Sequence, residues 1–302
     1  MMSKSEDGAI DFSFRRRDVQ LSAGPLSVRE AGDPGGETLL FVHGYGVNGT
    51  LWDRVAGPLS RHYRCVVPDL PFGSHPHALP AADLSPAGAA RLLGELVEEL
   101  GTDGVTIVAN DSGGAITQIF LTERPPGAER IGRLVLTNCD CFEAFPPGIF
   151  KLLVRTLRTP GGAGVIAASL HRARAQRGPL AYGSLSKDPI PDALLDSWVL
   201  PFREDAAIRD DARRFGAGMD PSYTLEAAAK LPSLRIPALL CWAENDRFFT
   251  IELGERLART IPDAQLVRFQ DALTFVPLDE PERLATEIEA FVAETTLAVS
   301  GA

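Results

Sequence analysis

Cysteine is scarce in this sequence, with four residues in 302. They are Cys65, Cys139, Cys141 and Cys241, and no two of them have the Cys-x-x-Cys spacing that is common in zinc and redox sites. So few and scattered cysteines indicate neither a disulfide framework nor a zinc site. We therefore expect free thiols at Cys139 and Cys141, no metal and no cofactor.

Long apolar runs are also absent. No stretch has the length and hydrophobicity of a membrane-spanning helix, and the first residues, MMSKSEDGAIDFSF, contain no apolar segment of the kind that a signal peptide needs. We therefore expect a cytoplasmic protein that has no membrane partner.

Positive charge is in deficit, with 30 Lys and Arg against 40 Asp and Glu and a net charge of -10. A chain of this charge repels phosphate backbones and anionic membrane surfaces. Nucleic acid is therefore not expected as a partner, and we expect a small-molecule substrate bound by a monomer or a homodimer. The basic run from Arg15 to Arg17 begins an alternating polar and apolar pattern, which predicts a solvated strand edge.

Apolar residues make up 45% of the chain, which is enough to bury a full core. Short apolar runs alternate with helical patterns, and this order is typical of a mostly parallel sheet covered on both faces by helices. Ligands of such sheets bind beyond the carboxyl ends of the strands, so polar residues there are the first candidates for chemistry. The predicted strands are residues 38–44, 64–70, 104–110, 131–138, 236–246 and 264–269.

Between residue 140 and about residue 231 this alternation stops. The segment is rich in Pro, Gly, Arg and Ala and has helical patterns without convincing strands. We interpret it as a helical cap inserted over the sheet. The predicted architecture is therefore α/β, with a core of residues 1–139 and 232–302 and a cap of residues 140–231.

The segment VANDSGG follows one predicted strand and opens a helical pattern. A sharp strand-to-helix turn that lifts one side chain above the sheet requires small residues two positions before and two positions after that side chain. With Asp111 at the turn these neighbours are Ala109 and Gly113, whereas with Ser112 the earlier neighbour is Asn110, which is too large and polar. The pattern therefore predicts Asp111 as the exposed residue. A polar loop that caps a helix is the alternative interpretation.

The motif HGYG, from His43 to Gly46, follows the first buried strand. Together with the turn and the strand order, it resembles the α/β-hydrolase fold, and the resemblance covers nearly the whole chain. It implies an oxyanion hole formed by the backbone N–H groups of Tyr45 and Ser112. An aspartate at the turn is similar to the haloalkane dehalogenase and epoxide hydrolase branch, in which the carboxylate attacks carbon and forms an alkyl ester.

Asp111 begins a predicted helix, where free N–H groups favour a negative charge. We therefore expect its pKa to be depressed, so that the side chain is ionised at neutral pH. A carboxylate in this state attacks a carbon atom without help from a base.

The resemblance also implies an acid after a late strand and a histidine before the last helix, which together activate water. Asp246, in CWAENDRFFT, matches the acid in chain order. The histidine loop corresponds to FQDALTFVPLDEPERLA, and Thr274 occupies the histidine position. Threonine has no basic nitrogen, so an ester on Asp111 has no histidine-activated water to hydrolyse it.

Five other residues are candidates for the missing roles. His75, in a loop beyond a strand end, is the strongest alternative base, whereas His43 belongs to the HG turn and is expected to be structural. Asp140, at the end of another strand, is an alternative acid. Tyr182 and Tyr223 lie in the predicted cap, where epoxide hydrolases place the tyrosines that protonate the opening ring.

Three functions compete. The first is a hydrolase of dehalogenase or epoxide-hydrolase type that acts on a small, mostly apolar substrate through Asp111. Ser112 stands where such dehalogenases usually carry a tryptophan that holds the halide, so halide release is poorly supported. The second is a lyase, isomerase or cyclase in which Asp111 transfers a proton and no water is activated. The third is a ligand-binding protein without catalysis, because fold does not determine function.

Overall fold

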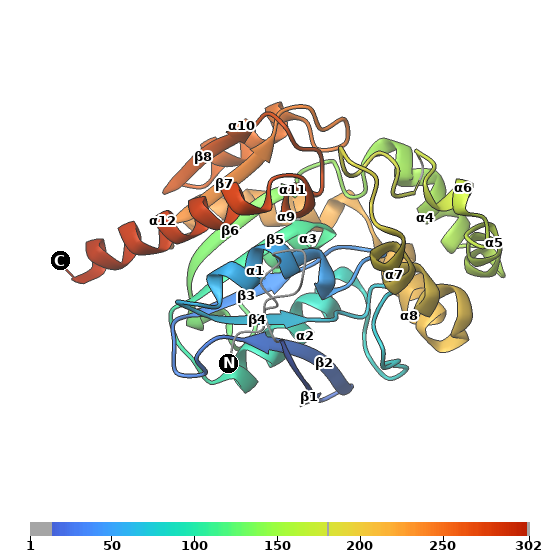
Figure 1. The fold of residues 1–302 in the computed structure, drawn as a ribbon, viewed down its shortest axis with the longest axis horizontal. Coiled ribbons are helices and arrows are strands. Elements are labelled where there is room, and N and C mark those ends of the chain that lie inside the picture. Colours follow the sequence, from blue (N-terminus) through green and yellow to red (C-terminus); the bar gives the residue numbers. More distant parts are fainter. Residues whose placement is uncertain (1–13, 180, 301–302) are drawn as a thin grey trace, which may run out of the picture.

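The protein is described from a computed structural model, which covers residues 14–179 and 181–300. Its centre is an eight-stranded sheet in the order β1-β2-β4-β3-β5-β6-β7-β8 (Figure 1). The strands are β1 (Arg15–Leu21), β2 (Gly24–Ala31), β3 (Thr38–Val42), β4 (Arg64–Pro68), β5 (Val105–Asp111), β6 (Ile131–Cys139), β7 (Ala238–Ala243) and β8 (Ala264–Phe269). Strands β3 to β8 are parallel, while β2 pairs antiparallel with both β1 and β4.

The six strands predicted from the apolar runs are present. The central strand β3 is buried along its whole length, as an all-parallel segment covered on both faces requires. The basic run from Arg15 to Arg17 lies in β1, at the edge of the sheet, where these residues are exposed or half-buried. The sheet therefore begins with an antiparallel hairpin, β1 and β2, that precedes the first predicted strand.

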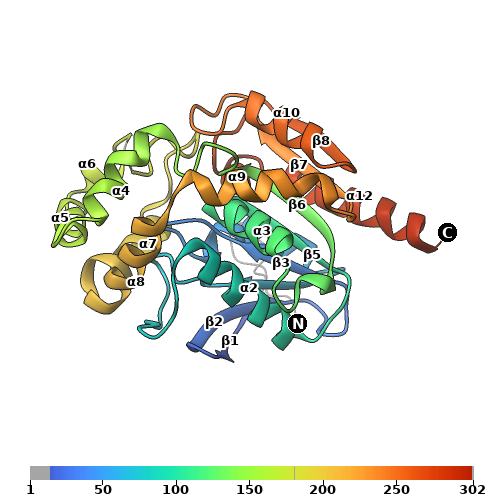
Figure 2. The same cartoon turned by 180° about the vertical axis from the view of Figure 1, so that it is seen from behind.

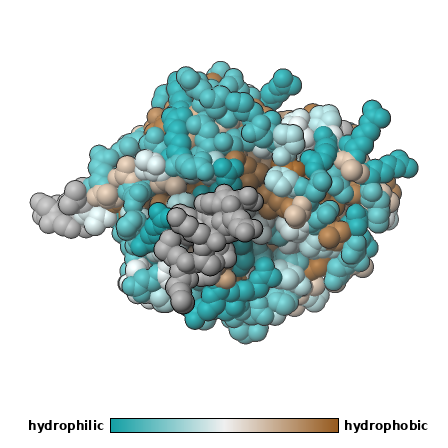
Figure 3. All heavy atoms as spheres, in the orientation of Figure 1, coloured by the Kyte–Doolittle hydropathy of each residue, from teal (hydrophilic) through white to brown (hydrophobic). Residues whose placement is uncertain are grey.

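Helices cover both faces of the sheet. On one face lie α1 (Asp53–Leu59), α11 (Val276–Asp279) and α12 (Pro281–Ser300), and on the other lie α2 (Pro86–Leu100), α3 (Ser112–Glu123), α9 (Pro221–Lys230) and α10 (Ile251–Thr260) (Figures 1 and 2). Apolar side chains fill the space between each layer and the sheet. The face of the molecule in Figure 3 is mainly hydrophilic, with hydrophobic residues exposed in small patches.

The chain between β6 and β7 contains α4 (Lys151–Leu157), α5 (Gly162–Ser169), α6 (Ala173–Gln176), α7 (Asp192–Glu204), α8 (Ala206–Gly218) and α9. Helices α4 to α8 stand apart from the sheet in one group (Figure 1). In contrast, α9 packs against α3 in the layer that covers the sheet (Figure 2). The range 140–231 expected for the cap thus includes a helix that packs on the core, and the separate group ends at Gly218. Within residues 14–179 and 181–300, no helix combines the length and apolar character needed to cross a bilayer.

Candidate active site

Asp111 lies at the junction of β5 and α3. Its backbone has φ 54° and ψ -135°, a conformation with positive φ that residues other than glycine rarely adopt. The residue is half-buried and lines a cavity, whereas Ser112 is already the first residue of α3. Asp111 rather than Ser112 therefore occupies the turn.

Close packing explains the glycines around this turn. A Cβ atom on Gly44 would lie 2.2 Å from Oδ2 of Asp111, and one on Gly113 would lie 2.4 Å from the carbonyl oxygen of His43. A Cβ atom on Gly114 would lie 2.3 Å from Cβ of Cys139 on β6. The HG and DSGG motifs thus let the loop after β3, the turn at Asp111 and α3 approach one another.

His43 holds the loop after β3 in place. The Leu70 backbone N–H donates to Nε2 at 2.8 Å, so the protonated Nδ1 donates to the carbonyl of Gly44, also at 2.8 Å. Burial lowers the pKa of His43 to about 4. Both ring nitrogens are thus engaged, and the side chain has a structural role, as expected.

The backbone N–H groups of Tyr45 and Ser112 flank the Asp111 carboxyl group, and both lower its pKa. The Tyr45 N–H also donates to Oγ of Ser112 at 2.7 Å. The pattern of the motif alone did not indicate this contact. In the resting protein, the Ser112 hydroxyl is therefore a partner of one of the two amides that the resemblance assigns to an oxyanion hole.

The expected depression of the Asp111 pKa is wrong. Burial is the largest influence and raises the pKa, and the charge of Asp246 raises it further. These effects outweigh the N–H groups of Ser112 and Tyr45, and the resulting pKa is about 7. The reason is that the turn lies inside an apolar cavity beside a second acid, so the N-terminus of α3 is not exposed to water.

Thr274 and Asp246 form a buried pair. The Thr274 hydroxyl donates to Oδ2 of Asp246 at 2.9 Å, and the Asn138 side-chain amide donates to the same oxygen at 3.0 Å. Backbone N–H groups of Phe248 and Phe249 donate to Oδ1. Burial raises the pKa of Asp246 to about 6, although these hydrogen bonds oppose the increase. Neither Thr274 nor Asp246 is among the described residues that line the cavity.

Two asparagines hold this pair in place. The Asn110 side-chain amide donates to the Thr274 carbonyl at 2.8 Å and to Oγ1 of Thr137 at 2.7 Å. Oδ1 of Asn138 accepts from the Ala243 N–H at 2.7 Å, which ties β6 to β7. Neither residue was expected to have a role in the site. The sequence did contain a feature that could have identified them, because each is a polar residue at the end of an apolar strand.

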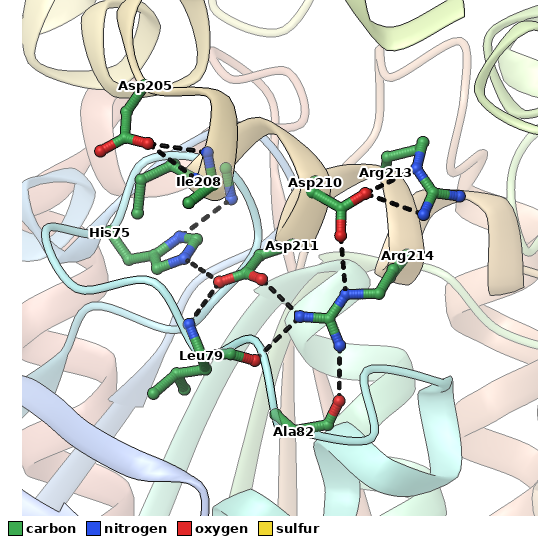
Figure 4. Close-up of polar contacts among 11 residues, drawn as sticks. His75, Leu79, Ala82, Asp205, Ile208, Asp210, Asp211, Arg213 and Arg214 are labelled. Carbon is green, nitrogen blue, oxygen red and sulfur yellow. Dashed lines mark hydrogen bonds and ion pairs between the residues drawn. The ribbon is translucent and has the colours of Figure 1, made fainter. Parts of the chain in front are cut away.

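His75 is not positioned as the missing base. It is buried, its Nδ1 accepts from the Gly73 N–H at 3.3 Å, and its Nε2–H donates to Oδ2 of Asp211 at 3.1 Å (Figure 4). Asp211, on α8, also accepts from the Leu79 N–H and from Arg214. His75 therefore joins the loop after β4 to α8, and it is not among the described residues that line the cavity.

The cavity lies between the carboxyl ends of the central strands and helices α4 to α8, and its volume is about 510 Å³. Most of its surface is apolar, and the lining includes Phe72, Leu153, Leu157, Leu170, Trp198 and Phe249. Such a volume and lining suit a small organic molecule of mainly apolar character.

The two candidate tyrosines of the cap differ in position. Tyr182 lines the cavity and donates its hydroxyl hydrogen to the carbonyl of Gly46. Burial raises its pKa, and the charge of Asp111 adds to the increase. Tyr223 is on α9, packs against the core and is absent from the described lining. Of the two tyrosines, only Tyr182 is thus close to the site, and its hydroxyl hydrogen is already donated to Gly46.

Asp140 follows β6 and lines the cavity beside Asp111. Only 2% of the residue is exposed, and within the described part of the chain its Oδ1 atom has no hydrogen-bond partner. Burial raises its pKa well above the ordinary value, and the charge of Asp111 raises it further. The site therefore holds two carboxyl groups in one apolar cavity.

Comparison with known proteins agrees with this architecture. The chain is 27% identical to a 2-hydroxy-6-oxononadienedioate/2-hydroxy-6-oxononatrienedioate hydrolase of Cupriavidus pinatubonensis, over 77% of this chain and 78% of that protein. It is 26% identical to a cis-3-alkyl-4-alkyloxetan-2-one decarboxylase of Xanthomonas campestris pv. campestris, over 95% and 98% of the two chains.

Among solved structures, the haloalkane dehalogenase DbeA of Bradyrhizobium elkani is similar in fold. Its TM-score is 0.78 at 19% identity, and the match covers 95% of this chain and 100% of that chain. The family described as the α/β hydrolase fold matches residues 37–281. The strand order, the turn at Asp111 and this match lead to one conclusion: the chain belongs to the α/β-hydrolase fold family.

Proposed function

We propose that the protein is a hydrolase in which the Asp111 carboxylate attacks a carbon atom of a small, mostly apolar substrate and forms an alkyl ester. The observation that carries this proposal is the position of Asp111, which lines an apolar cavity at the strand-to-helix turn. The backbone N–H groups of Ser112 and Tyr45 flank its carboxyl group. These groups are suited to stabilise the oxyanion that forms when such an ester is hydrolysed.

The relatives support a reaction at an electrophilic carbon. One relative is named a hydrolase, and another, matched over 95% of this chain, is named for an oxetan-2-one ring that carries two alkyl groups. The latter compound combines a strained carbon–oxygen bond with apolar chains. A cavity of about 510 Å³ with a mainly apolar lining is compatible with a substrate of this class.

A second candidate function is proton transfer by Asp111 without an ester, as in a lyase or isomerase. It is favoured by the pKa of about 7, which suits a group that both accepts and releases a proton near neutral pH. The name of the decarboxylase relative is also compatible with a reaction that is not hydrolysis.

The experiment is intact-protein mass spectrometry after brief incubation with 1-iodooctane, 1,2-epoxyoctane or a dialkyl oxetan-2-one. An ester on Asp111 adds the octyl group of 1-iodooctane or the whole mass of the ring compound that has opened, and peptide mapping then locates it in the segment from Val108 to Gly114. The Asp111→Asn variant should not form this ester. Turnover that continues in Asp111→Asn without any adduct would contradict the nucleophile role, and turnover without an adduct that is lost in Asp111→Asn would favour proton transfer.

A further inference from the structure

Asp140 and Asp111 end neighbouring strands of the sheet. The Asp140 N–H donates to the Asp111 carbonyl at 3.3 Å, and the Gln118 side-chain amide donates to the Asp140 carbonyl at 2.8 Å. These contacts anchor the backbone of Asp140 to β5 and α3. Both acidic residues line the same cavity.

The surroundings of the Asp140 carboxyl group differ from those of Asp246. Asp246 accepts hydrogen bonds from Thr274, Asn138 and two backbone N–H groups. Asp140 is 2% exposed, and its Oδ1 has no partner within the described part of the chain. A buried carboxylate oxygen without a donor is unfavourable, and burial raises the pKa of Asp140, so both effects favour the neutral acid.

We propose that Asp140 is a catalytic residue that donates a proton to the leaving oxygen of the substrate and then accepts a proton from the water that hydrolyses the ester on Asp111. The substrate class is accordingly an electrophile with a carbon–oxygen bond to be broken, such as an epoxide or a strained cyclic ester. This inference rests on the proposed ester at Asp111.

The acidities of the two groups are in the order that this role requires. Burial raises the pKa of Asp140 well above its ordinary value and the charge of Asp111 raises it further, whereas the charge that raises the pKa of Asp111 is that of Asp246, so the proton of the pair is assigned to Asp140. The neighbouring Cys139 and Cys141 thiols are neutral, because burial raises their pKa values as well. Asp246 is the further charge that acts on Asp111.

The steps balance for an epoxide. A carboxylate oxygen of Asp111 attacks a ring carbon and forms the ester, the ring carbon–oxygen bond breaks, and the leaving oxygen takes the proton of Asp140. Asp140 is then a carboxylate, and it accepts a proton from water as the hydroxide adds to the ester carbonyl. When this intermediate collapses, the departing alkoxide takes that proton, and the proton left on Asp111 returns to Asp140. The sum is epoxide plus water to diol, with one residue acting first as acid and then as base.

Burial raises the pKa of the Tyr45 and Tyr182 phenols in the lining, so a carboxyl group is the stronger proton donor in this cavity. Asp111 and Asp140 are the only acids among the described lining residues, and Tyr182 donates its hydrogen to Gly46. The Trp198 indole N–H donates to Oγ1 of Thr50 at 2.8 Å, so this donor is not directed at a halide in the cavity. An oxygen leaving group that is protonated by Asp140 therefore fits the site better than a halide.

The test compares two substrates in the Asp140→Asn variant, followed by rapid-quench mass spectrometry. Iodide takes no proton and leaves Asp140 neutral, so 1-iodooctane should alkylate Asp111 at the native rate in this variant and reports ester formation alone. With 1,2-epoxyoctane, formation of the ester should be slowed by about 10²–10⁴-fold, because the leaving oxygen lacks its proton donor. Hydrolysis of the ester that does form should be slowed by a similar factor, because no carboxylate accepts the proton of the attacking water.

Three controls complete the design. Asparagine replaces a neutral acid of the same shape, and native alkylation by 1-iodooctane reports an intact site. Asp140→Glu keeps a carboxyl group and should regain part of the ester hydrolysis, while Asp103→Asn removes an exposed carboxylate that pairs with Arg130 and should react like the native protein.

The outcomes separate the two proposals. If the native protein forms no ester on Asp111 with either probe, the proposed function fails, and the role of Asp140 fails with it. If the native protein forms the ester, and Asp140→Asn forms it at native rates with both probes and hydrolyses the ester from 1,2-epoxyoctane at the native rate, only the role of Asp140 is overturned.

Discussion

The Thr274 hydroxyl donates a hydrogen bond to the Asp246 carboxylate, with 2.9 Å between Oγ1 and Oδ2. Thr274 is fully buried and occupies the position where the α/β-hydrolase resemblance implies a histidine. The acid of the expected triad is therefore satisfied by threonine, asparagine and two backbone N–H groups. This arrangement gives Asp246 a structural environment, and in the proposed mechanism the chemistry of the cavity is carried by Asp111 and Asp140.

Replacement of Thr274 by valine should lower stability without slowing alkylation of Asp111. The change keeps the shape but removes a hydrogen bond to a buried charged group, which corresponds to about 1.5–3 kcal/mol of unfolding free energy. Urea unfolding measures this loss. The control is Thr286→Val on the exposed side of α12, where we expect a change within about 0.5 kcal/mol. Loss of alkylation in folded Thr274→Val would assign Thr274 a direct role instead.

The rate at which 1-iodooctane alkylates Asp111 should rise with pH. Attack requires the carboxylate, so the rate should increase about tenfold per pH unit below the pKa and level off above it, with a midpoint of about 7. Iodide is chosen because its departure needs no proton. Stopped reactions between pH 5 and pH 9, quantified by mass spectrometry, measure the profile. A constant rate from pH 5 upward would match a depressed pKa and contradict the effect of burial.

Asp111 should also reduce stability above neutral pH. Its pKa is raised from 3.8 to about 7 in the folded state, so its favourable contribution is present below about pH 4 and is lost as pH rises through 7. Between pH 5 and pH 8 this loss corresponds to about 2–3 kcal/mol. In urea unfolding, Asp111→Asn should therefore gain stability relative to the native protein as pH increases over this range. If the two proteins differ in unfolding free energy by the same amount at pH 5 and at pH 8, burial does not perturb the pKa of this carboxyl group.

The contact between His75 and Asp211 should stabilise the attachment of α8 to the loop after β4. Asp211 is buried and accepts from His75, Leu79 and Arg214, and these hydrogen bonds keep its pKa low although burial raises it (Figure 4). Asp211→Ala leaves these donors unpaired, so we expect a loss of about 3–5 kcal/mol in urea unfolding.

The matched control for this contact is Asp210→Asn on the same helix. Asp210 is exposed and pairs with Arg213 and Arg214, so its removal should change stability by less than about 1 kcal/mol. Hydrogen exchange of the segment from Gly73 to Ala82 should accelerate in Asp211→Ala and not in Asp210→Asn. Equal losses of unfolding free energy in both variants would indicate that the buried contact stabilises the protein no more than the exposed one.

Several features follow from local sequence alone. The six apolar runs predict six strands, because burial on both faces demands continuous apolar sequence. The position of Asp111 at the turn follows from steric limits on its near neighbours, and Gly113 indeed leaves no room for a Cβ atom. The loop pattern likewise shows that threonine occupies position 274, where the resemblance implies a histidine.

Tertiary structure decided the electrostatics of the site and its partners. The pKa of Asp111 depends on the depth of the cavity and on Asp246, a residue far away in sequence, so the helix N-terminus alone predicted the wrong direction. His75 lies in a loop near the site, yet α8 supplies Asp211 and turns it into a structural residue. The role proposed for Asp140 depends on β5 and β6 being neighbours and on the lack of a donor to Oδ1 within the described residues. Steric limits between neighbouring residues can be predicted from consecutive sequence. In contrast, the burial of a side chain and its hydrogen-bond partners depend on segments that meet only in the folded chain.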